Sequence, residues 1–273
     1  MKIRRNLLHA DDGTQCAFQR SPNQGGRLSP RYLVMHYTAG ANADSAIAHM
    51  LKPTAKVSAH LVIARDGTMT QLVPFNKIAW HAGQSRWHGL VGLNRHAIGI
   101  ELDNAGKLKM QGGEWRSWFG RTYAEPDVAV ATHMHDDVER GWHIYSEAQL
   151  TAATGAAQAI VAHYGLADVL GHDDIAPNRK FDPGPAFPME SFRASVTGRD
   201  NDAPLAFTTR SQLNIRSGPG TGRDKLRPEP LDKGQRLLVL SRHGSWCQVE
   251  VIDDDDQPDL TGWVHGDYIE PAS

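Results

Sequence analysis

The sequence predicts an α/β domain, with a mixed central β-sheet flanked by helices, followed by a small all-β barrel. Two observations carry this prediction. Over residues 1–196, β-favouring runs alternate with helical segments, as in an α/β domain. Over residues 205–273, short strands recur between Gly, Pro and Asp turns, as in a small barrel. We expect the boundary at a polar linker, residues 197–204.

The central strands are predicted by two runs. Residues 31–38 are apolar on both faces, which suits a buried strand. Residues 97–103 form a second strand, in which Glu101 lies on the face opposite the apolar side chains. Between these two runs, Asp66-Gly67 favours a tight hairpin turn.

The helices are predicted from their ends. Asp44 can N-cap a short helix. Ser146 and Gln149 fit a capping box before the Ala-rich run 150–164, which Gly165 ends.

Three remaining segments have weaker patterns. Residues 1–30 are polar and rich in turns, so we expect an arm that wraps around the domain. Residues 105–145 mix aromatic and polar side chains, and we predict a loop-rich insertion with one turn of helix. Residues 189–196 suit a final helical segment.

The composition is that of a folded protein without a nucleic-acid partner. The 273 residues suffice for two domains, and a hydrophobic content of 40% favours a packed core over disorder. A net charge of −2 argues against nucleic acid. Cys16 and Cys247 are too few and too far apart for a disulfide framework or a Cys-rich zinc finger.

Neither a secretory signal nor membrane insertion is expected. The basic start is not followed by an apolar run of about 7–15 residues. No window approaches the roughly 18 apolar residues of a membrane span. We expect a chain that is made in the cytoplasm and acts elsewhere after lysis or non-classical export.

Residues 171–187 are the candidate functional loop. Their three prolines prevent a long helix, so the loop is rigid and fixes the direction of its side chains. It carries His172 and Asp182. With His36 from the first central strand, they would give three protein ligands and leave a fourth zinc position for water. The sequence therefore predicts a Zn²⁺ site suited to hydrolysis.

Hydrolysis of an amide also needs a base and a positive group near the developing oxyanion. Glu101, on a rigid strand, is the candidate base. Lys180, two residues before Asp182, is the candidate oxyanion stabiliser. The alternative is structural: Glu101 pairs with Arg95, Lys180 is solvated, and the histidines are hydrogen-bonded packing residues.

A rival ligand cluster lies in the insertion. His133 and His135 precede Asp136 and Asp137, a spacing that resembles a set of metal ligands. With 14 histidines in the chain, such a grouping also arises without a metal.

Seven sequence blocks, in order, point to one family. They are His36–Gly40, Ser58–His60, Arg65–Thr68, Ala79–Gly83, Ile98–Glu101, His172–Pro177 and Arg179–Gly184. Residues 28–195 thereby resemble the zinc-dependent N-acetylmuramoyl-L-alanine amidases, the amidase type 2 family related to peptidoglycan recognition proteins and phage amidase lysozymes. The resemblance implies the amidase type 2 fold. It also implies cleavage of the amide between N-acetylmuramic acid and the L-alanine of the stem peptide.

The resemblance also implies roles for single residues. It implies that His36, His172 and Asp182 are zinc ligands. It further implies that Glu101 is the catalytic carboxylate and that Lys180 stabilises the transition state. Asp182 stands where some relatives carry cysteine, which gives a harder ligand set.

Substrate contacts are implied as well. Trp80 and His81 look like residues of the substrate groove, with a packed aromatic and its neighbour as the alternative. Asn104 could touch the stem peptide. Ala59 stands where some relatives carry a tyrosine, so more of the base role rests on Glu101.

Residues 205–270 resemble a bacterial SH3-like domain. The matching blocks are Leu213–Gly220, Gly244–Val249, Gly262–Val264 and Tyr268–Ile269. Such modules often bind cell-wall peptides through aromatic clefts, which implies peptidoglycan as the partner. Trp246 and Trp263 would line such a cleft or belong to the barrel core, and we expect the core for at least one of them.

Two other functions stay open. The chain could be a catalytically silent peptidoglycan sensor, against which the intact residue set argues. It could also hydrolyse a different cell-wall amide, which analysis of the products would reveal.

Overall fold

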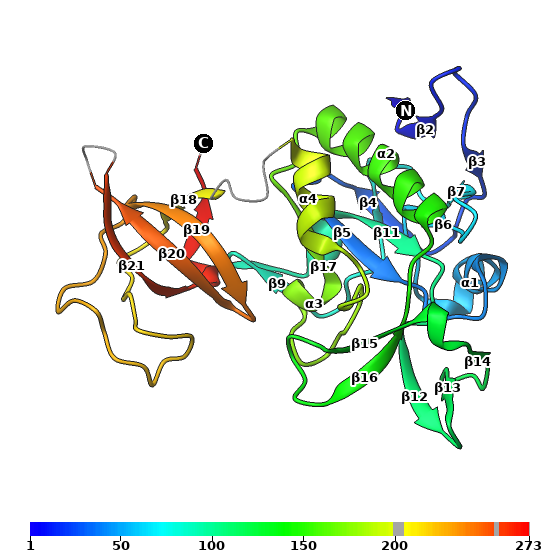
Figure 1. Ribbon diagram of the computed structural model, residues 1–273. Helices are drawn as coiled ribbons and strands as arrows, with labels where there is room; N and C mark the ends of the chain where they lie inside the picture. The colour runs from blue at the N-terminus through cyan, green and yellow to red at the C-terminus, as the bar shows by residue number, and fades with distance from the viewer. Residues whose placement is uncertain (199–204, 254–256, 273) are drawn as a thin grey trace. The chain divides into compact units, whose positions relative to one another are not determined.

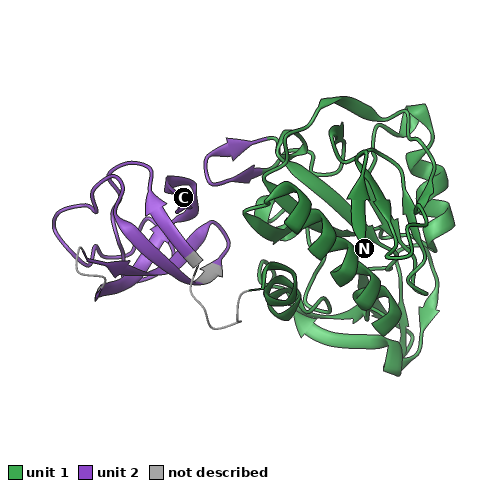
Figure 2. Ribbon diagram, turned by 90° about the horizontal axis from the view of Figure 1, so that it is seen from above, with its two compact units in different colours: residues 1–85, 92–201 green, residues 86–91, 202–273 purple. Residues whose placement is uncertain are grey.

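The computed structural model describes residues 1–198, 205–253 and 257–272, which form two units (Figure 2). Unit 1 comprises residues 1–85 and 92–201, and unit 2 comprises residues 86–91 and 202–273. Of the predicted linker 197–204, residues 199–204 lie outside the described residues. The predicted domain boundaries therefore stay predictions.

Unit 1 is built around a six-stranded mixed sheet (Figure 1). Its strands, in spatial order, are β17 (Asp168–Gly171), β5 (Tyr32–Tyr37), β11 (Ala97–Leu102), β6 (Leu61–Ile63), β7 (Met69–Gln71) and β3 (Ala17–Phe18). β5 pairs in parallel with both β17 and β11, and β11 pairs in parallel with β6. The β6–β7 hairpin is antiparallel and turns at Gly67, whose φ is +86°. The mixed sheet agrees with the predicted fold class.

One face of this sheet packs against α2 (Glu147–Tyr164) and α4 (Met189–Thr197), which lie side by side in Figure 1. The buried cluster between them includes Leu33, Met35, Ile98, Ile100, Ala153, Ala157, Ile160 and Phe192. α1 (Ala43–Met50) packs against Val62 in a separate cluster. Strand alternation places His36 and Glu101 on the face opposite α2.

One helix cap and one capping box differ from the predictions. Asn42, rather than Asp44, caps α1, because its side chain accepts a hydrogen bond from Ser45 N. Ser146 caps α2 as predicted. The Gln149 side chain, however, donates to backbone oxygens of neighbouring segments, so the reciprocal half of the capping box is not formed.

The insertion is a β-sheet, so the prediction of a loop-rich segment was wrong. Its spatial order is β14 (Thr122–Tyr123), β13 (Glu114–Arg116), β12 (Lys107–Gln111), β16 (Glu139–His143) and β15 (Val128–Thr132). The strands are short, and many outward-facing residues are charged or aromatic, which hides the alternation. Gly141 lies under the Trp115 ring, where a Cβ atom would lie 2.5 Å from it. The glycine lets the Trp115 side chain of β13 reach across β12 and pack on β16.

Smaller elements complete unit 1. The N-terminal segment forms β1 (Lys2–Arg4), β2 (Leu7–His9) and β4 (Gln24–Arg27), the last paired with β8 (Lys77–Ala79). Short helices are α3 (His172–Ile175), η1 (Pro53–Ala55), η2 (Leu93–Arg95) and η3 (Glu125–Asp127). The predicted arm is thus partly β-structure.

Unit 2 contains a five-stranded antiparallel sheet. Its spatial order is β21 (Pro258–His265), β20 (Trp246–Ile252), β19 (Arg236–His243), β18 (Leu205–Thr209) and β22 (Ile269–Pro271), and η4 (Gly266–Tyr268) precedes the last strand. Its core includes Phe207, Ile215, Leu231, Leu237, Val249, Val264 and Ile269. Trp246 and Trp263 are both partly exposed and outside this core, so the expectation that one of them is buried there was wrong.

Unit 2 also includes a hairpin from the middle of the chain, β9 (Arg86–Trp87) and β10 (Leu90–Val91). Within the unit, His88 donates from Nδ1 to the Gly266 carbonyl and accepts a hydrogen bond on its own carbonyl from Arg210. Its ring lies 5.1 Å from the Phe207 ring. Among the described residues, no helix has both the length and the apolar character needed to cross a lipid bilayer.

Candidate metal centre and active site

Three elements bring the predicted ligands together. His36 lies in β5, His172 begins α3 directly after β17, and Asp182 follows in the proline-rich loop. Parallel pairing aligns Gly171 with Met35, so β17 delivers His172 beside His36. All three side chains are buried, with relative exposures of 0%, 2% and 6%.

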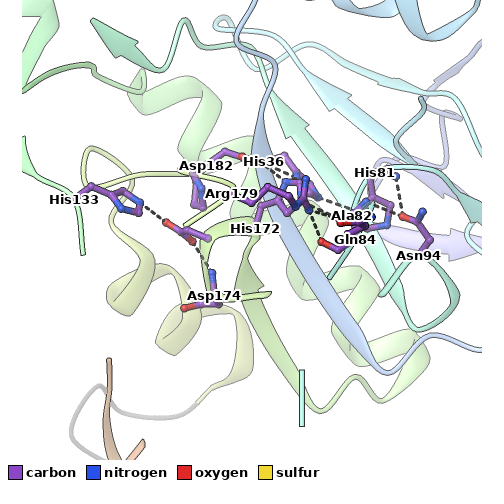
Figure 3. Close-up of polar contacts among 12 residues, drawn as sticks. His36, His81, Ala82, Gln84, Asn94, His133, His172, Asp174, Arg179 and Asp182 are labelled. Carbon is purple, nitrogen blue, oxygen red and sulfur yellow. Dashed lines mark hydrogen bonds and ion pairs between the residues drawn. The ribbon is translucent and has the colours of Figure 1, made fainter. Parts of the chain in front are cut away.

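The ligand atoms form a tight triangle (Figure 3). His36 Nδ1, His172 Nδ1 and Asp182 Oδ2 lie 2.9 Å from one another in all three pairs. Among the described residues, this is the one group of three His, Cys, Asp or Glu side chains whose ligand atoms come together closely enough to hold a metal ion.

The other ring nitrogens of the histidines fix their tautomers. His81 Nε2 lies 3.2 Å from the Ala97 carbonyl, which can only accept, so His81 Nδ1 carries the lone pair. His36 Nε2 lies 2.9 Å from that Nδ1 and must donate to it. The Nδ1 atom of His36 is therefore left with a lone pair that faces the centre.

His172 is fixed in the same way. Its Nε2 donates to the Ala82 carbonyl at 3.1 Å, so its Nδ1 also presents a lone pair. The Ala82 carbonyl is held by Arg179, whose Nη2 donates to it at 2.9 Å and to Gln84 O at 2.6 Å. Asn94 Oδ1 accepts from the backbone N–H groups of His81 and Ala82. These contacts appear around the centre in Figure 3.

The protonation states suit a cation. Burial, with the neighbouring His172, lowers the pKa of His36 to about 4, so its ring is neutral at pH 7. Burial acts to raise the pKa of Asp182, but the adjacent His172 and His36 rings outweigh it and hold the pKa well below the usual range. Two lone pairs and a carboxylate oxygen in mutual contact repel one another unless a cation lies among them. The donor set therefore fits a metal ion.

Gly99 makes room for the ring that orients His36. A Cβ atom at this position would lie 2.5 Å from the His81 ring, too close for any L side chain. The glycine in the Ile98-Gly99-Ile100-Glu101 block thus permits the His81–His36 hydrogen bond.

Glu101 lies beside His36, because the two are register partners in the β5–β11 pair. None of the described residues donates a hydrogen bond to its buried Oε2 atom. Burial raises the pKa of Glu101 to about 8, Asp182 adds to this rise, and Lys180 opposes it. A buried carboxylate oxygen without a protein partner can accept a proton from water.

Lys180 is partly exposed, and no ion pair joins it to another residue of the described ranges. The positive charge of Lys180 lowers the pKa of both His36 and Glu101. In each case its effect is smaller than that of burial. An unpaired ammonium group near the ligand triangle can stabilise negative charge that develops there.

The predicted substrate residues occupy different positions. Trp80 is partly exposed, and its backbone N–H donates to Ser58. His81 is buried behind His36. Asn104 is buried at the base of the insertion. Its Nδ2 donates to the His143 carbonyl, and its Oδ1 accepts from the Gly106 N–H. A substrate contact for each of the three stays a prediction.

The rival cluster in the insertion has another role. His133 Nδ1 accepts from His135 N, so His133 Nε2 donates to Asp173 Oδ2 at 3.0 Å (Figure 3). The His133 ring also lies 5.0 Å from the Phe181 ring. His133 thus joins the insertion to the loop that carries His172 and Asp182. Sequence reasoning missed this link and the roles of Arg179 and Asn94, since nothing in the sequence indicates their partners.

Residues 26–185 match the family model described as N-acetylmuramoyl-L-alanine amidase. The chain belongs to this amidase family. Residues 211–270 match the bacterial SH3 domain family. The amidase match contains both sequence segments that supply the ligand triangle.

Curated relatives extend the family match. The chain is 34% identical over 224 residues to N-acetylmuramoyl-L-alanine amidase AmiD of Escherichia coli (strain K12), covering 78% of this chain and 66% of AmiD. It is 36% identical over 152 residues to 1,6-anhydro-N-acetylmuramyl-L-alanine amidase AmpD of Salmonella typhimurium (strain SL1344), covering 55% of this chain and 60% of AmpD. The chain thus spans just under two thirds of the length of these amidases.

Among solved structures, the crystal structure of a selenomethionine AmpD derivative resembles this fold with a TM-score of 0.50 and 29% identity. The match covers 72% of this chain and 99% of that chain. The amidase-family fold is therefore shared over nearly the whole of that AmpD chain.

Proposed function

We propose that this chain is a zinc-dependent N-acetylmuramoyl-L-alanine amidase. It hydrolyses the amide between the lactyl group of N-acetylmuramic acid and the L-alanine of the peptidoglycan stem peptide. The observation that carries the proposal is the ligand triangle, in which both histidines present an unprotonated Nδ1 atom. Beside it lies the Glu101 Oε2 atom, which has no hydrogen-bond partner among the described residues. The family membership supports the choice of substrate.

Zinc suits this donor set. Two neutral imidazoles and one carboxylate are ligands that zinc accepts, and three protein ligands leave a position for water or substrate. Bound zinc would supply a Lewis acid and lower the pKa of a bound water. His36, His172 and Asp182 would hold it.

The protein groups then divide the remaining chemistry. Glu101 takes a proton from the attacking water on its Oε2 atom and later gives it to the departing amine. Burial raises the pKa of Glu101 toward neutral pH, where one group can both take and return a proton. Lys180 stabilises the negative charge that develops on the carbonyl oxygen. His81 and the Ala82 carbonyl keep the ligand rings in place.

The second unit would hold the enzyme on its substrate. We propose that the region 205–273 binds peptidoglycan and favours action on intact wall over small recycled fragments. We also propose that the enzyme meets the wall after lysis or non-classical export.

The test compares the wild-type protein with Glu101→Gln. We measure zinc per chain, clearance of purified sacculi, and free N-terminal L-alanine in the products. The wild type should bind one zinc and release L-alanine termini. Glu101→Gln should keep its zinc and lose about 10²- to 10⁴-fold in kcat.

Other outcomes have defined meanings. Zinc binding without cleavage of sacculi or soluble muropeptides would identify a binding protein instead of an enzyme. Cleavage without free L-alanine termini would identify a hydrolase of a different amide. Unchanged kcat in Glu101→Gln would remove Glu101 from the mechanism.

A further inference from the structure

Trp118 is the most exposed of the large apolar side chains in the described part of the chain, with a relative exposure of 77%. It is nevertheless fixed, because its indole Nε1–H donates to the Ala39 carbonyl at 2.7 Å. Its ring meets the Phe119 ring in a T-shaped contact at 5.7 Å, and most of the indole surface is still exposed. A large, oriented apolar surface that remains in water is typical of a binding site.

The turn that carries Trp118 is tied to the same loop by a second bond. Arg121 Nη1 donates to the Ala41 carbonyl at 2.8 Å. Ser117 closes the turn. Its N–H and its hydroxyl donate to the Arg121 carbonyl, and its hydroxyl oxygen accepts from the Arg121 N–H. Residues 117–121 therefore hold Trp118 in one place against residues 39–41.

That loop leads directly from the metal centre. Ala39 lies three residues after His36, where the chain leaves β5 at its carboxyl end. Three residues span at most about 10 Å. Ligands of α/β sheets bind at the carboxyl ends of parallel strands. A polymer bound at the metal centre can therefore reach the Trp118 ring.

The chemistry of the ring selects the occupant. The indole N–H is already bonded, so the ring offers an uncharged apolar face. Arg121, on the same turn, lies over the Phe119 ring at 5.9 Å and donates to the Ala41 carbonyl. Such a face suits the C–H face of a sugar ring better than a stem peptide, which carries carboxylates.

We propose that Trp118 is a stacking platform for a sugar ring of the peptidoglycan glycan strand, next to the residue whose amide is cleaved. The platform belongs to the insertion and extends the substrate site beyond the cleaved unit. This inference rests on the proposed amidase function. It makes the enzyme selective for glycan strands over single muropeptides.

The experiment uses the full zinc-loaded chain and two soluble substrates: a single muramoyl peptide, and a glycan fragment of several disaccharide-peptide repeats. Trp118→Ala is compared with Met110→Ala, a matched control whose side chain is 51% exposed on the same insertion sheet. Trp118→Ala should raise KM for the glycan fragment roughly tenfold and leave kcat unchanged. It should leave both constants for the muramoyl peptide within about twofold, and Met110→Ala should change neither.

A binding measurement separates this proposal from the proposed function. In the Glu101→Gln background, calorimetric titration with the glycan fragment needs no turnover. Trp118→Ala should weaken this binding by the same factor, and Trp118→Phe should restore part of it. If the wild type cleaves neither substrate, the proposed function fails, while the titration still decides on the platform.

Two results would overturn the platform. Equal KM and Kd values for Trp118→Ala and the wild type would show that the ring contacts no sugar. An equal loss on both substrates would show that Trp118 acts on the cleaved unit, its stem peptide included, or on the fold.

Discussion

At the scale of single residues, the candidate centre depends on groups that do not contact the predicted ligand atoms. His81 fixes the tautomer of His36, and Gly99 leaves the space that the His81 ring fills. Neither role follows from residue type, because a buried imidazole can serve as a ligand, an orienting group or packing. The sequence therefore predicts the three ligands that the structure brings together, but not the two residues that orient the first of them.

Gly99→Ala tests this arrangement. The added methyl would lie 2.5 Å from the His81 ring, so the ring must move and the His36 hydrogen bond is lost. We expect zinc affinity to fall by about 10- to 100-fold, as for other losses of a group that orients a metal ligand. Competition with a chromogenic chelator measures the change.

Gly26→Ala is the matched control, since a Cβ there meets no heavy atom within 4 Å. Its zinc affinity should equal that of the wild type. Wild-type affinity in Gly99→Ala would show that His81 does not orient His36.

His143 makes folding sensitive to acid. Burial, with help from the Arg65 charge, lowers its folded pKa to about 4, and its Nδ1 accepts the Ala105 N–H. Because an unfolded histidine titrates near about 6.5, the unfolded chain takes up this proton first as the pH falls. The contribution of neutral His143 to the free energy of unfolding is complete above about pH 7 and is lost as the pH falls toward 4.

Urea unfolding of the wild type and His143→Asn at pH 7.5 and 5 checks this sign. Asparagine keeps an acceptor near Nδ1 but does not titrate. Between the two pH values, the wild type should lose about 1 kcal/mol more free energy of unfolding than the variant, after an allowance for solvent screening. Parallel losses in the two proteins would exclude His143 as the source.

At the scale of elements, the insertion shows where sequence patterns stop being informative. The central strands are recognisable because both of their faces are buried and apolar. The insertion strands have few buried residues, and their packing depends on contacts across the sheet such as Trp115 over Gly141. The link from His133 to Asp173 spans 40 residues, so only the folded chain reveals it.

A double-mutant cycle measures that link. His133→Ala leaves the buried Asp173 carboxylate without its histidine partner, so we expect a loss of about 3 kcal/mol in the free energy of unfolding. Asp173→Asn in that background should cost little more, because no charge is then left buried. We expect a coupling energy of about 1–3 kcal/mol from chemical denaturation of the four proteins. Additive effects within 0.5 kcal/mol would contradict a specific pair.

At the scale of the whole molecule, each unit has its own hydrophobic core, and unit 1 alone supplies the ligand triangle. Metal binding should therefore stabilise only unit 1. In scanning calorimetry, a chelator should lower the midpoint of one transition by several degrees and leave the other in place. A shift of both transitions would show that the units unfold together.

The Arg86–Val91 hairpin gives the molecule a less modular character than its sequence suggests. A chimera that exchanges residues 205–273 for another wall-binding module would keep His88 but lose its bonds to Gly266 and Arg210. The vacated hairpin would present Trp87 and His88 side chains that are buried in the native chain. Recombination at the linker alone would thus leave a hairpin with newly exposed apolar surface inside the amidase sequence, which favours aggregation. A workable fusion would have to redesign this hairpin together with the module it accepts.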